Sequence, residues 1–163
     1  MDYAVVLDWI LQQIQRWDVQ ALAFDRWGIA ELILRLDEHN VPYTYAVDDR
    51  EIVEGRMLLL DHPQGFMIPH RKGYEMRPAM PRSIAHAEEA ILTITLKVKR
   101  NLALRSAVLG TVPVVDASLN RRFMKNKALT AIDACVALVM AVGIAIDARD
   151  QQKGELSTEE VVW

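Results

Sequence analysis

The chain has 163 residues, of which 52% are hydrophobic and 25% charged, so it has ample material for a packed core and predicts little disorder. Its length predicts one domain. A net charge of -3 excludes a globally basic nucleic-acid-binding protein, and a single cysteine, Cys135, excludes a disulfide framework and a cysteine-based zinc cluster. The N-terminus is acidic, unlike a signal peptide, and the longest apolar stretch, residues 134–146, is too short to span a membrane. We therefore expect a soluble protein of the reducing cytoplasm.

The first 47 residues predict an α/β arrangement. Apolar residues recur at helical spacing at Val6, Trp9, Ile10, Ile14 and Trp17. The apolar run of residues 19–24 is typical of a buried parallel strand. Residues 27–40 then predict a second helix, and residues 43–47 a second strand. Helices alternating with strands indicate a parallel sheet covered by helices.

The middle of the chain is less regular. Residues 48–82 hold four of the six prolines and predict a long functional or mobile loop, within which MLLLD is a candidate short strand. A helix is expected from about Ser83, although TITLKVK also fits an alternating strand. The apolar face of this helix comprises Ile84, Ala87, Ile91, Ile94 and Val98.

The C-terminal part predicts a further α/β segment. Residues 101–109 are a short helix candidate, and residues 111–116 read as a strand. SLNRRFMKNK, residues 118–127, predicts a basic turn. The last helix, residues 131–148, is apolar almost all round and is therefore expected to be central. The polar tail after Arg149 is expected to fray.

Charge is distributed unevenly along the chain. Residues 1–61 carry 12 acids and 5 bases, whereas residues 97–127 carry 8 bases and one acid. A basic cluster of this kind can bind a polyanion through counterion release. The alternative is an ordinary solvated basic face, which is common on protein surfaces.

Several common kinds of catalytic site are absent from the sequence. It contains no phosphate-binding loop, no G-x-G-x-x-G, no zinc-binding histidine spacing and no serine nucleophile elbow. We therefore expect no ATP hydrolysis by this chain.

Two acids, Asp25 and Asp133, are placed unusually. Asp25 follows the predicted buried strand, at the sheet edge where α/β proteins bind ligands. Asp133 lies in the apolar last helix, where we expect it to be buried and to need a partner such as a divalent metal. Both have a structural alternative. Asp25 can cap the following helix, and Thr130 with Asp133 fits a capping box.

The sequence segments around these acids resemble segments of the nuclease domain of bacteriophage terminase large subunits. AFDRWGIAELILRL, around Asp25, resembles an aspartate–arginine–tryptophan segment of that family, and IDACVALVMAVGIA, around Asp133, resembles its final helix. Further matches follow the family in order at QGF, MRPAM, HAEEAIL, NLALRSAV and SLNRRFMKNK.

The resemblance implies a ribonuclease-H-like α/β nuclease fold and a two-metal endonuclease that cuts viral DNA during packaging. Asp25 and Asp133 would be catalytic acids that hold Mg²⁺ or Mn²⁺. Phosphate contacts to double-stranded DNA would come from basic residues near them: Arg26, Arg121, Arg122, Lys125 and Lys127. Partners would include an upstream ATPase segment, the terminase small subunit and the portal.

The sequence also departs from the family pattern. The family's first acid lies on a strand ahead of the segment matched here, so the resemblance implies an N-terminally truncated domain over residues 1–148, with residues 48–82 as an insertion and residues 149–163 as a tail. Without that acid we expect weak activity or none, and a missing strand would expose a sheet edge for self-association. The alternative is a non-catalytic DNA- or partner-binding remnant of a prophage protein. Another ribonuclease-H-like nuclease, such as a junction resolvase, fits the ordered matches less well.

Overall fold

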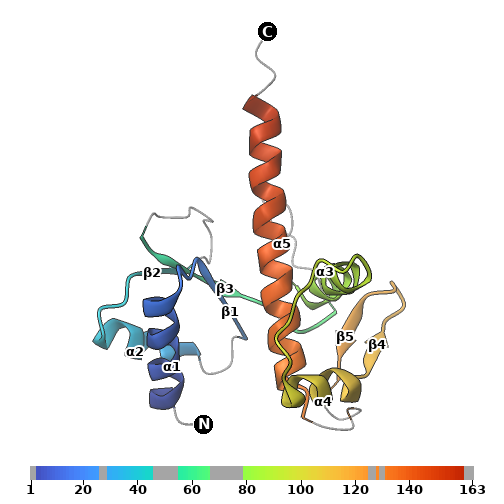
Figure 1. The fold of residues 1–163 in the computed structure, drawn as a ribbon, viewed down its shortest axis with the longest axis horizontal. Coiled ribbons are helices and arrows are strands. Elements are labelled where there is room, and N and C mark those ends of the chain that lie inside the picture. Colours follow the sequence, from blue (N-terminus) through green and yellow to red (C-terminus); the bar gives the residue numbers. More distant parts are fainter. Residues whose placement is uncertain are drawn as a thin grey trace. The chain divides into compact units, whose positions relative to one another are not determined.

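The computed structural model describes residues 3–25, 29–45, 55–66, 79–124, 128 and 131–159 (Figure 1). Contacts within the chain divide it into two compact units, Met1–His62 (unit 1) and Pro63–Trp163 (unit 2), and each is described by itself. Among the helices described, none has the length and hydropathy needed to cross a membrane.

Unit 1 contains the elements that its sequence predicts. In chain order they are α1 (Tyr3–Arg16), β1 (Ala21–Phe24), α2 (Ile29–Glu38), β2 (Tyr43–Tyr45) and β3 (Met57–Asp61). The predicted order of helix, strand, helix and strand is confirmed, and the candidate strand MLLLD is β3. After α2 the chain turns at Asn40, whose φ of 52° is a left-handed value that asparagine tolerates. The N–H of Val41 then donates to the carbonyl of Leu36 at 3.0 Å, which satisfies one of the last helix carbonyls.

The three strands form a parallel sheet in the order β1-β3-β2 (Figure 1). On one side of β3, Phe24 is the register partner of Asp61, and on the other side Tyr43 is the partner of Met57. The predicted parallel sheet is therefore confirmed. Within the described sheet β1 is an edge strand, and an edge strand presents backbone groups that can pair with another strand.

The core of unit 1 brings α1 and α2 against the sheet residues. It comprises Leu7, Ile10, Phe24, Leu32, Leu36, Met57 and Leu59. The residues from each helix are three or four positions apart, the spacing of a single helix face. Trp9 and Trp17, which the sequence pattern assigned to that face, are exposed.

Unit 2 is built around one long helix. Its elements are α3 (Met80–Leu92), α4 (Leu102–Gly110), β4 (Pro113–Val115), β5 (Arg121–Phe123) and α5 (Asp133–Glu159). Helices α3 and α4 both pack against α5, and β5 contacts α3 (Figure 1). The helix predicted at residues 101–109 and the strand predicted at residues 111–116 are confirmed as α4 and β4. Asn101 caps α4, because its side-chain oxygen accepts a hydrogen bond from the N–H of Leu104 at 3.0 Å.

The helix expected at residues 83–98 is shorter than predicted. It begins earlier, at Met80, with a proline in the first turn where the missing N–H costs nothing. It ends at Leu92 because Ile94 adopts a left-handed φ of 57°. The N–H groups of Ile94 and Thr95 then donate back to carbonyls of the last turn, those of Ile91 and Ala90, at 3.1 and 3.0 Å. This is a Schellman motif, which satisfies the last helix carbonyls and turns the chain out of the helix. Residues 93–101 form neither the predicted helical extension nor the alternative strand, so both interpretations of TITLKVK are wrong.

The basic segment SLNRRFMKNK is not only a turn. Residues 121–123 form β5, which pairs antiparallel with β4. The side chain of Asp116 organises the connection, because its Oδ1 accepts hydrogen bonds from the N–H groups of Ser118 and Asn120 at 2.9 and 2.8 Å. This is the geometry of an Asx turn, and it connects β4 to β5. The segment predicted as a basic turn is therefore part of a β-hairpin.

The last helix, α5, is longer than predicted and buried on one face. It begins at Asp133 rather than residue 131 and continues to Glu159, so the predicted fraying after residue 149 is not seen in the described backbone. The buried positions include Cys135, Val136, Val139 and Met140, whereas the neighbouring alanines at 134, 137 and 141 are exposed. Small alanines on the open face explain why the sequence looks apolar all round. The domain boundary at residue 148 stays a prediction.

Candidate functional site

The carboxyl edge of the parallel sheet carries Asp25. It follows β1 directly, and its side chain is half-buried. The carbonyl of Phe24 accepts a hydrogen bond from the N–H of His62 at 2.9 Å, which ties the ends of β1 and β3 together beside Asp25. Its capping alternative and the DNA-contact role of Arg26 depend on residues 26–28, which lie outside the described residues, so both stay predictions.

A second carboxylate, Asp61, lies at the same edge and was not among the predicted site residues. It is the last residue of β3 and the register partner of Phe24, so Asp25 and Asp61 end neighbouring strands. Such strands lie about 4.8 Å apart. The Oδ1 atom of Asp61 is buried. The sequence did contain the signal, because MLLLD ends in aspartate as ALAFD does, but the assignment of residues 48–82 to a loop obscured it.

The donor chemistry of this edge fits a hard divalent cation. Carboxylate oxygens are the ligands that Mg²⁺ and Mn²⁺ prefer, and two of them follow adjacent parallel strands here. Within the described ranges, no three His, Cys, Asp or Glu side chains form a group that could hold a metal ion. Asp25 and Asp61 are thus two candidate ligands from unit 1.

Asp133 occupies a different environment from the one predicted. It is the first residue of α5, and its side chain is exposed, so the expectation of a buried carboxylate is wrong. The carbonyl of Ile132 accepts the first intrahelical hydrogen bond, from the N–H of Val136 at 3.0 Å, and this places Asp133 in the first turn. A carboxylate at this position is stabilised by the helix dipole and stays open to solvent. Thr130, its proposed capping partner, lies outside the described residues.

Asp25 belongs to unit 1 and Asp133 to unit 2. Their convergence at one metal site therefore stays a prediction.

The two arginines of β5 are held by contacts within unit 2. Arg121 Nη2 lies 2.8 Å from Glu88 Oε2 on α3, and this hydrogen bond and charge lower the pKa of the Glu88 carboxyl. The guanidinium of Arg122 lies 4.5 Å above the ring of Phe66, which is cation–π geometry. Both side chains are half-buried, so they help to hold the hairpin in place. Their role in DNA binding stays a prediction, as does that of Lys125 and Lys127, which lie outside the described residues.

A buried charge cluster joins α3 to α5. Arg82 Nε lies 2.7 Å from Asp147 Oδ1, and His86 Nδ1 lies 3.7 Å from the same oxygen. Asp147 is buried on α5, one turn beyond Gly143, which packs against Ser83. The sequence signal was an acid inside an otherwise apolar helix, the same signal that drew attention to Asp133. The contacts of Asp147 give it a structural role in fixing the crossing of the two helices.

Comparison with known proteins supports the resemblance inferred from the sequence. The chain matches no protein-family model. It is 28% identical over 155 residues, 95% of its length, to the terminase large subunit of Enterobacteria phage HK97. The crystal structure of the HK97 bacteriophage large terminase matches 88% of the chain with a TM-score of 0.64 and 26% identity.

The predicted resemblance to phage terminase large subunits is therefore confirmed, and so is the α/β, ribonuclease-H-like fold class. The chain spans about a quarter of the length of these relatives, 26% of the first and 25% of the second.

Proposed function

We propose that this chain acts as the nuclease part of a phage DNA-packaging terminase, a metal-dependent endonuclease for double-stranded DNA that is weakly active or inactive alone. The observation that carries the proposal is the similarity to a terminase large subunit along 95% of the chain, which includes the segments around both Asp25 and Asp133. The fold match to a large terminase supports it. Its place of action would be the host cytoplasm, with the terminase small subunit, the portal and an upstream ATPase segment as partners.

In this proposal Asp25 and Asp133 hold Mg²⁺ or Mn²⁺. Two positions support it: Asp25 follows β1 at the carboxyl edge of the parallel sheet, where α/β proteins bind ligands, and Asp133 is an exposed residue at the start of α5. Asp61 supplies a further carboxylate on the neighbouring strand. When bound at such a site, divalent ions activate a water molecule and stabilise the leaving oxygen of a phosphodiester.

The basic residues would orient DNA rather than take part in the chemistry. Phosphate contacts fix the position of a duplex without reading its sequence, and arginine and lysine supply most of them. Arg26, Lys125 and Lys127 are the candidates for this role. Arg121 and Arg122 are candidates as well, and they also hold the β4–β5 hairpin through Glu88 and Phe66.

The test is thermal unfolding of the full chain with and without Mn²⁺, together with nicking of supercoiled plasmid. A ligand present at about 100 times its Kd stabilises the folded state by about 2.7 kcal/mol, so wild type should melt at a higher temperature with Mn²⁺. Asp25→Asn and Asp133→Asn should each lose this shift, and Asp8→Asn, an exposed acid on α1, should keep it as the matched control.

Two results would contradict the metal site. Either the wild-type chain gains no stability from Mn²⁺ or Mg²⁺, or the gain persists unchanged in Asp25→Asn and Asp133→Asn. Loss of the shift in Asp61→Asn as well would assign Asp61 as an additional ligand.

A non-catalytic DNA- or partner-binding remnant is the second candidate. It is favoured by an apolar groove with a cationic rim in unit 2. In that case metal leaves the melting temperature unchanged, and binding to DNA or to a protein persists without nicking.

A further inference from the structure

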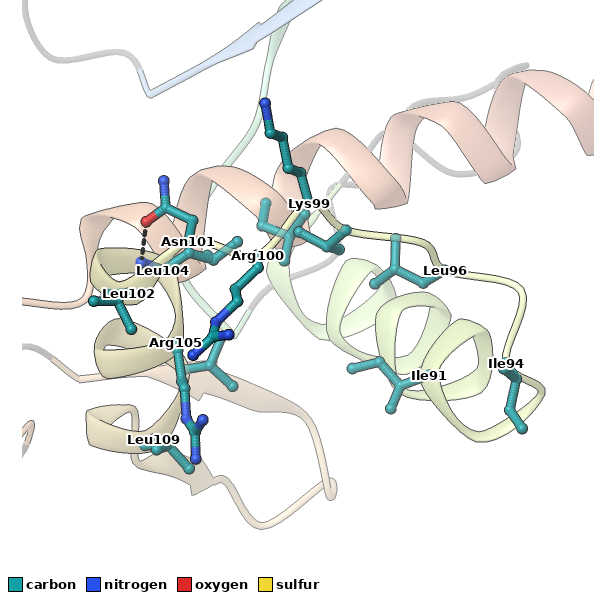
Figure 2. Close-up of a pocket in the computed structure, with 13 residues that line it drawn as sticks. Ile91, Ile94, Leu96, Lys99, Arg100, Asn101, Leu102, Leu104, Arg105 and Leu109 are labelled. Carbon is teal, nitrogen blue, oxygen red and sulfur yellow. Dashed lines mark hydrogen bonds between the residues drawn. The ribbon is translucent and has the colours of Figure 1, made fainter.

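Unit 2 contains a large apolar groove that the proposed nuclease does not use. Its cavity has a volume of about 430 Å³, within the range of sites that hold ligands. The walls come from the end of α3, the segment of residues 94–101, α4 and one residue of α5 (Figure 2). We call this surface the α3–α4 groove; its lining includes Ile91, Ile94, Leu96, Leu102, Leu104 and Leu109.

The apolar side chains of this groove are open to solvent to an unusual degree. Ile94 is 82% exposed, Leu102 is 71% exposed and Leu109 is 72% exposed. Single exposed leucines are ordinary on protein surfaces, but a contiguous patch around a cavity marks an interaction site. The groove forms because α3 stops at Leu92, so the chain passes over to α4 without covering these residues.

The rim of the groove is cationic. Lys99, Arg100 and Arg105 line it, and no acidic residue occurs between residues 93 and 115. In Figure 2 the side chains of Arg100 and Arg105 extend to the same side, and Lys99 extends away from them. None of the three forms a salt bridge with another described residue. Within the described part of the chain, these charges are therefore left for a partner to meet.

The lining distinguishes a protein partner from a nucleic acid. Surfaces that bind single strands place aromatic rings under the bases, and none of the residues that line this groove is aromatic. Contacts to phosphates alone would leave the exposed leucine and isoleucine side chains unburied. Leucine and isoleucine walls between cations instead match the apolar face and acidic flanks of an amphipathic helix.

We propose that the α3–α4 groove binds a short acidic amphipathic helix of a partner protein. Large apolar residues of that helix, spaced three or four positions apart, insert between α3 and α4. Its aspartates and glutamates meet Lys99, Arg100 and Arg105. The charge pattern selects acidic helices and rejects basic ones, because like charges across the rim would repel. This inference stands whether or not the nuclease site is active.

The probe is a fluorescein-labelled helical peptide with leucine at positions i, i+3, i+4 and i+7 and glutamate elsewhere. Binding to the full chain is followed by fluorescence anisotropy at low and high salt. One control peptide keeps the leucines and replaces glutamate by lysine, and a second keeps the glutamates and replaces leucine by serine. Only the peptide that has both leucine and glutamate should bind, and salt should weaken its binding.

Variants locate the binding on the groove. Leu102→Ser and Leu109→Ser should each weaken binding about tenfold, since each removes an apolar side chain that the peptide would cover. The matched control is Leu119→Ser, which is 81% exposed and lies outside the groove. Arg100→Glu with Arg105→Glu should abolish the preference for glutamate over lysine, whereas Arg56→Glu in unit 1 should not. All of these side chains are exposed, and circular dichroism checks that the variants fold.

Several results would overturn the proposal. Equal binding of the lysine or serine peptide, or no binding at all, would remove the acidic amphipathic helix as the occupant. Self-association of wild type that Leu102→Ser or Leu109→Ser abolishes would assign the groove to a second copy of this chain. Binding of DNA, but of no peptide, that the double arginine reversal abolishes would assign it to nucleic acid.

Discussion

Replacement of Gly143 by alanine tests how α3 and α5 cross. A Cβ atom at Gly143 would lie 2.5 Å from the Cβ of Ser83 and 3.0 Å from its Cα. Ordinary carbon contacts are about 3.5–4.0 Å, so the two helices would have to separate by about 1 Å. The same separation would stretch the nearby ion pair between Arg82 and Asp147, whose atoms are now 2.7 Å apart.

Two opposing contributions set the size of the effect. Alanine is favoured over glycine inside a helix by about 1 kcal/mol, whereas overpacking a close-packed contact costs about 1–3 kcal/mol. Weakening of the buried ion pair adds to that cost, because breaking such a pair costs about 3–5 kcal/mol in full. We therefore expect Gly143→Ala to lower the free energy of unfolding by about 2 kcal/mol, a fall in Tm of about 4–8 °C for a chain of this length.

The assay is urea unfolding followed by far-ultraviolet circular dichroism, carried out as a double-mutant cycle with Ser83→Gly. Ser83→Gly removes the side chain that the new methyl group would meet. The double variant should therefore be about 1–3 kcal/mol more stable than the sum of the two single substitutions predicts. Ala145→Gly, on the exposed face of α5, measures the helix propensity alone. A Gly143→Ala variant that is about 1 kcal/mol more stable than wild type would refute the close crossing, since that is the gain at an uncrowded helix position.

Three further predictions concern charges. Asp147→Asn should lower the free energy of unfolding by about 3 kcal/mol, because it removes the negative member of a buried ion pair, and a decrease under about 1 kcal/mol in urea unfolding would contradict that role. Because Arg121 lowers the pKa of Glu88, the pair stabilises the fold above the unfolded-state pKa and loses this effect as the pH falls through the lowered folded-state value. The urea midpoints of wild type and Glu88→Gln should therefore differ at neutral pH and converge in acid; a constant difference would exclude the pair as the cause. Lys125→Glu with Lys127→Glu should weaken binding to double-stranded DNA and reduce the salt slope by about 0.9 for each phosphate that the protein no longer neutralises, whereas an unchanged slope would remove these lysines from the interface.

The elements of unit 1 were predictable because their signals are local. Helical spacing of apolar residues predicts α1 and α2, and short apolar runs predict β1 and β2. The strand order β1-β3-β2 was not predictable in the same way, since β3 comes last in the sequence and yet lies between the other two. Its position depends on contacts between residues far apart in the chain, such as Leu22 with Leu59, and no local pattern encodes them.

The candidate acids show the same division between local and non-local information. A strand that ends in aspartate places that side chain at the sheet edge, so Asp25 was located from its own neighbours. The exposure of Asp133 depends instead on which face of α5 packs against the rest of unit 2. Ile132 and Cys135 are buried on either side of it, whereas Asp133 and Ala134 are exposed. The packed face is set by contacts with distant residues, and a helix that is apolar almost all round gives no local signal for it.

The largest error of the sequence interpretation marks the strongest candidate for an interaction surface. The apolar spacing predicts that Ile91, Ile94 and Val98 lie on the buried face of one continuous helix, yet all three are exposed and line the α3–α4 groove. Their periodicity is genuine, but the left-handed backbone of Ile94 and the hydrogen bond from the N–H of Thr95 to the carbonyl of Ala90 end the helix before the pattern ends. Apolar residues that follow the spacing of a buried helix face, but lie where the helix has ended, are left without that face to pack them against a core. In this chain they line a cavity whose rim cations make no salt bridge with another described residue. We therefore expect a segment of a partner protein, rather than the rest of unit 2, to bury them.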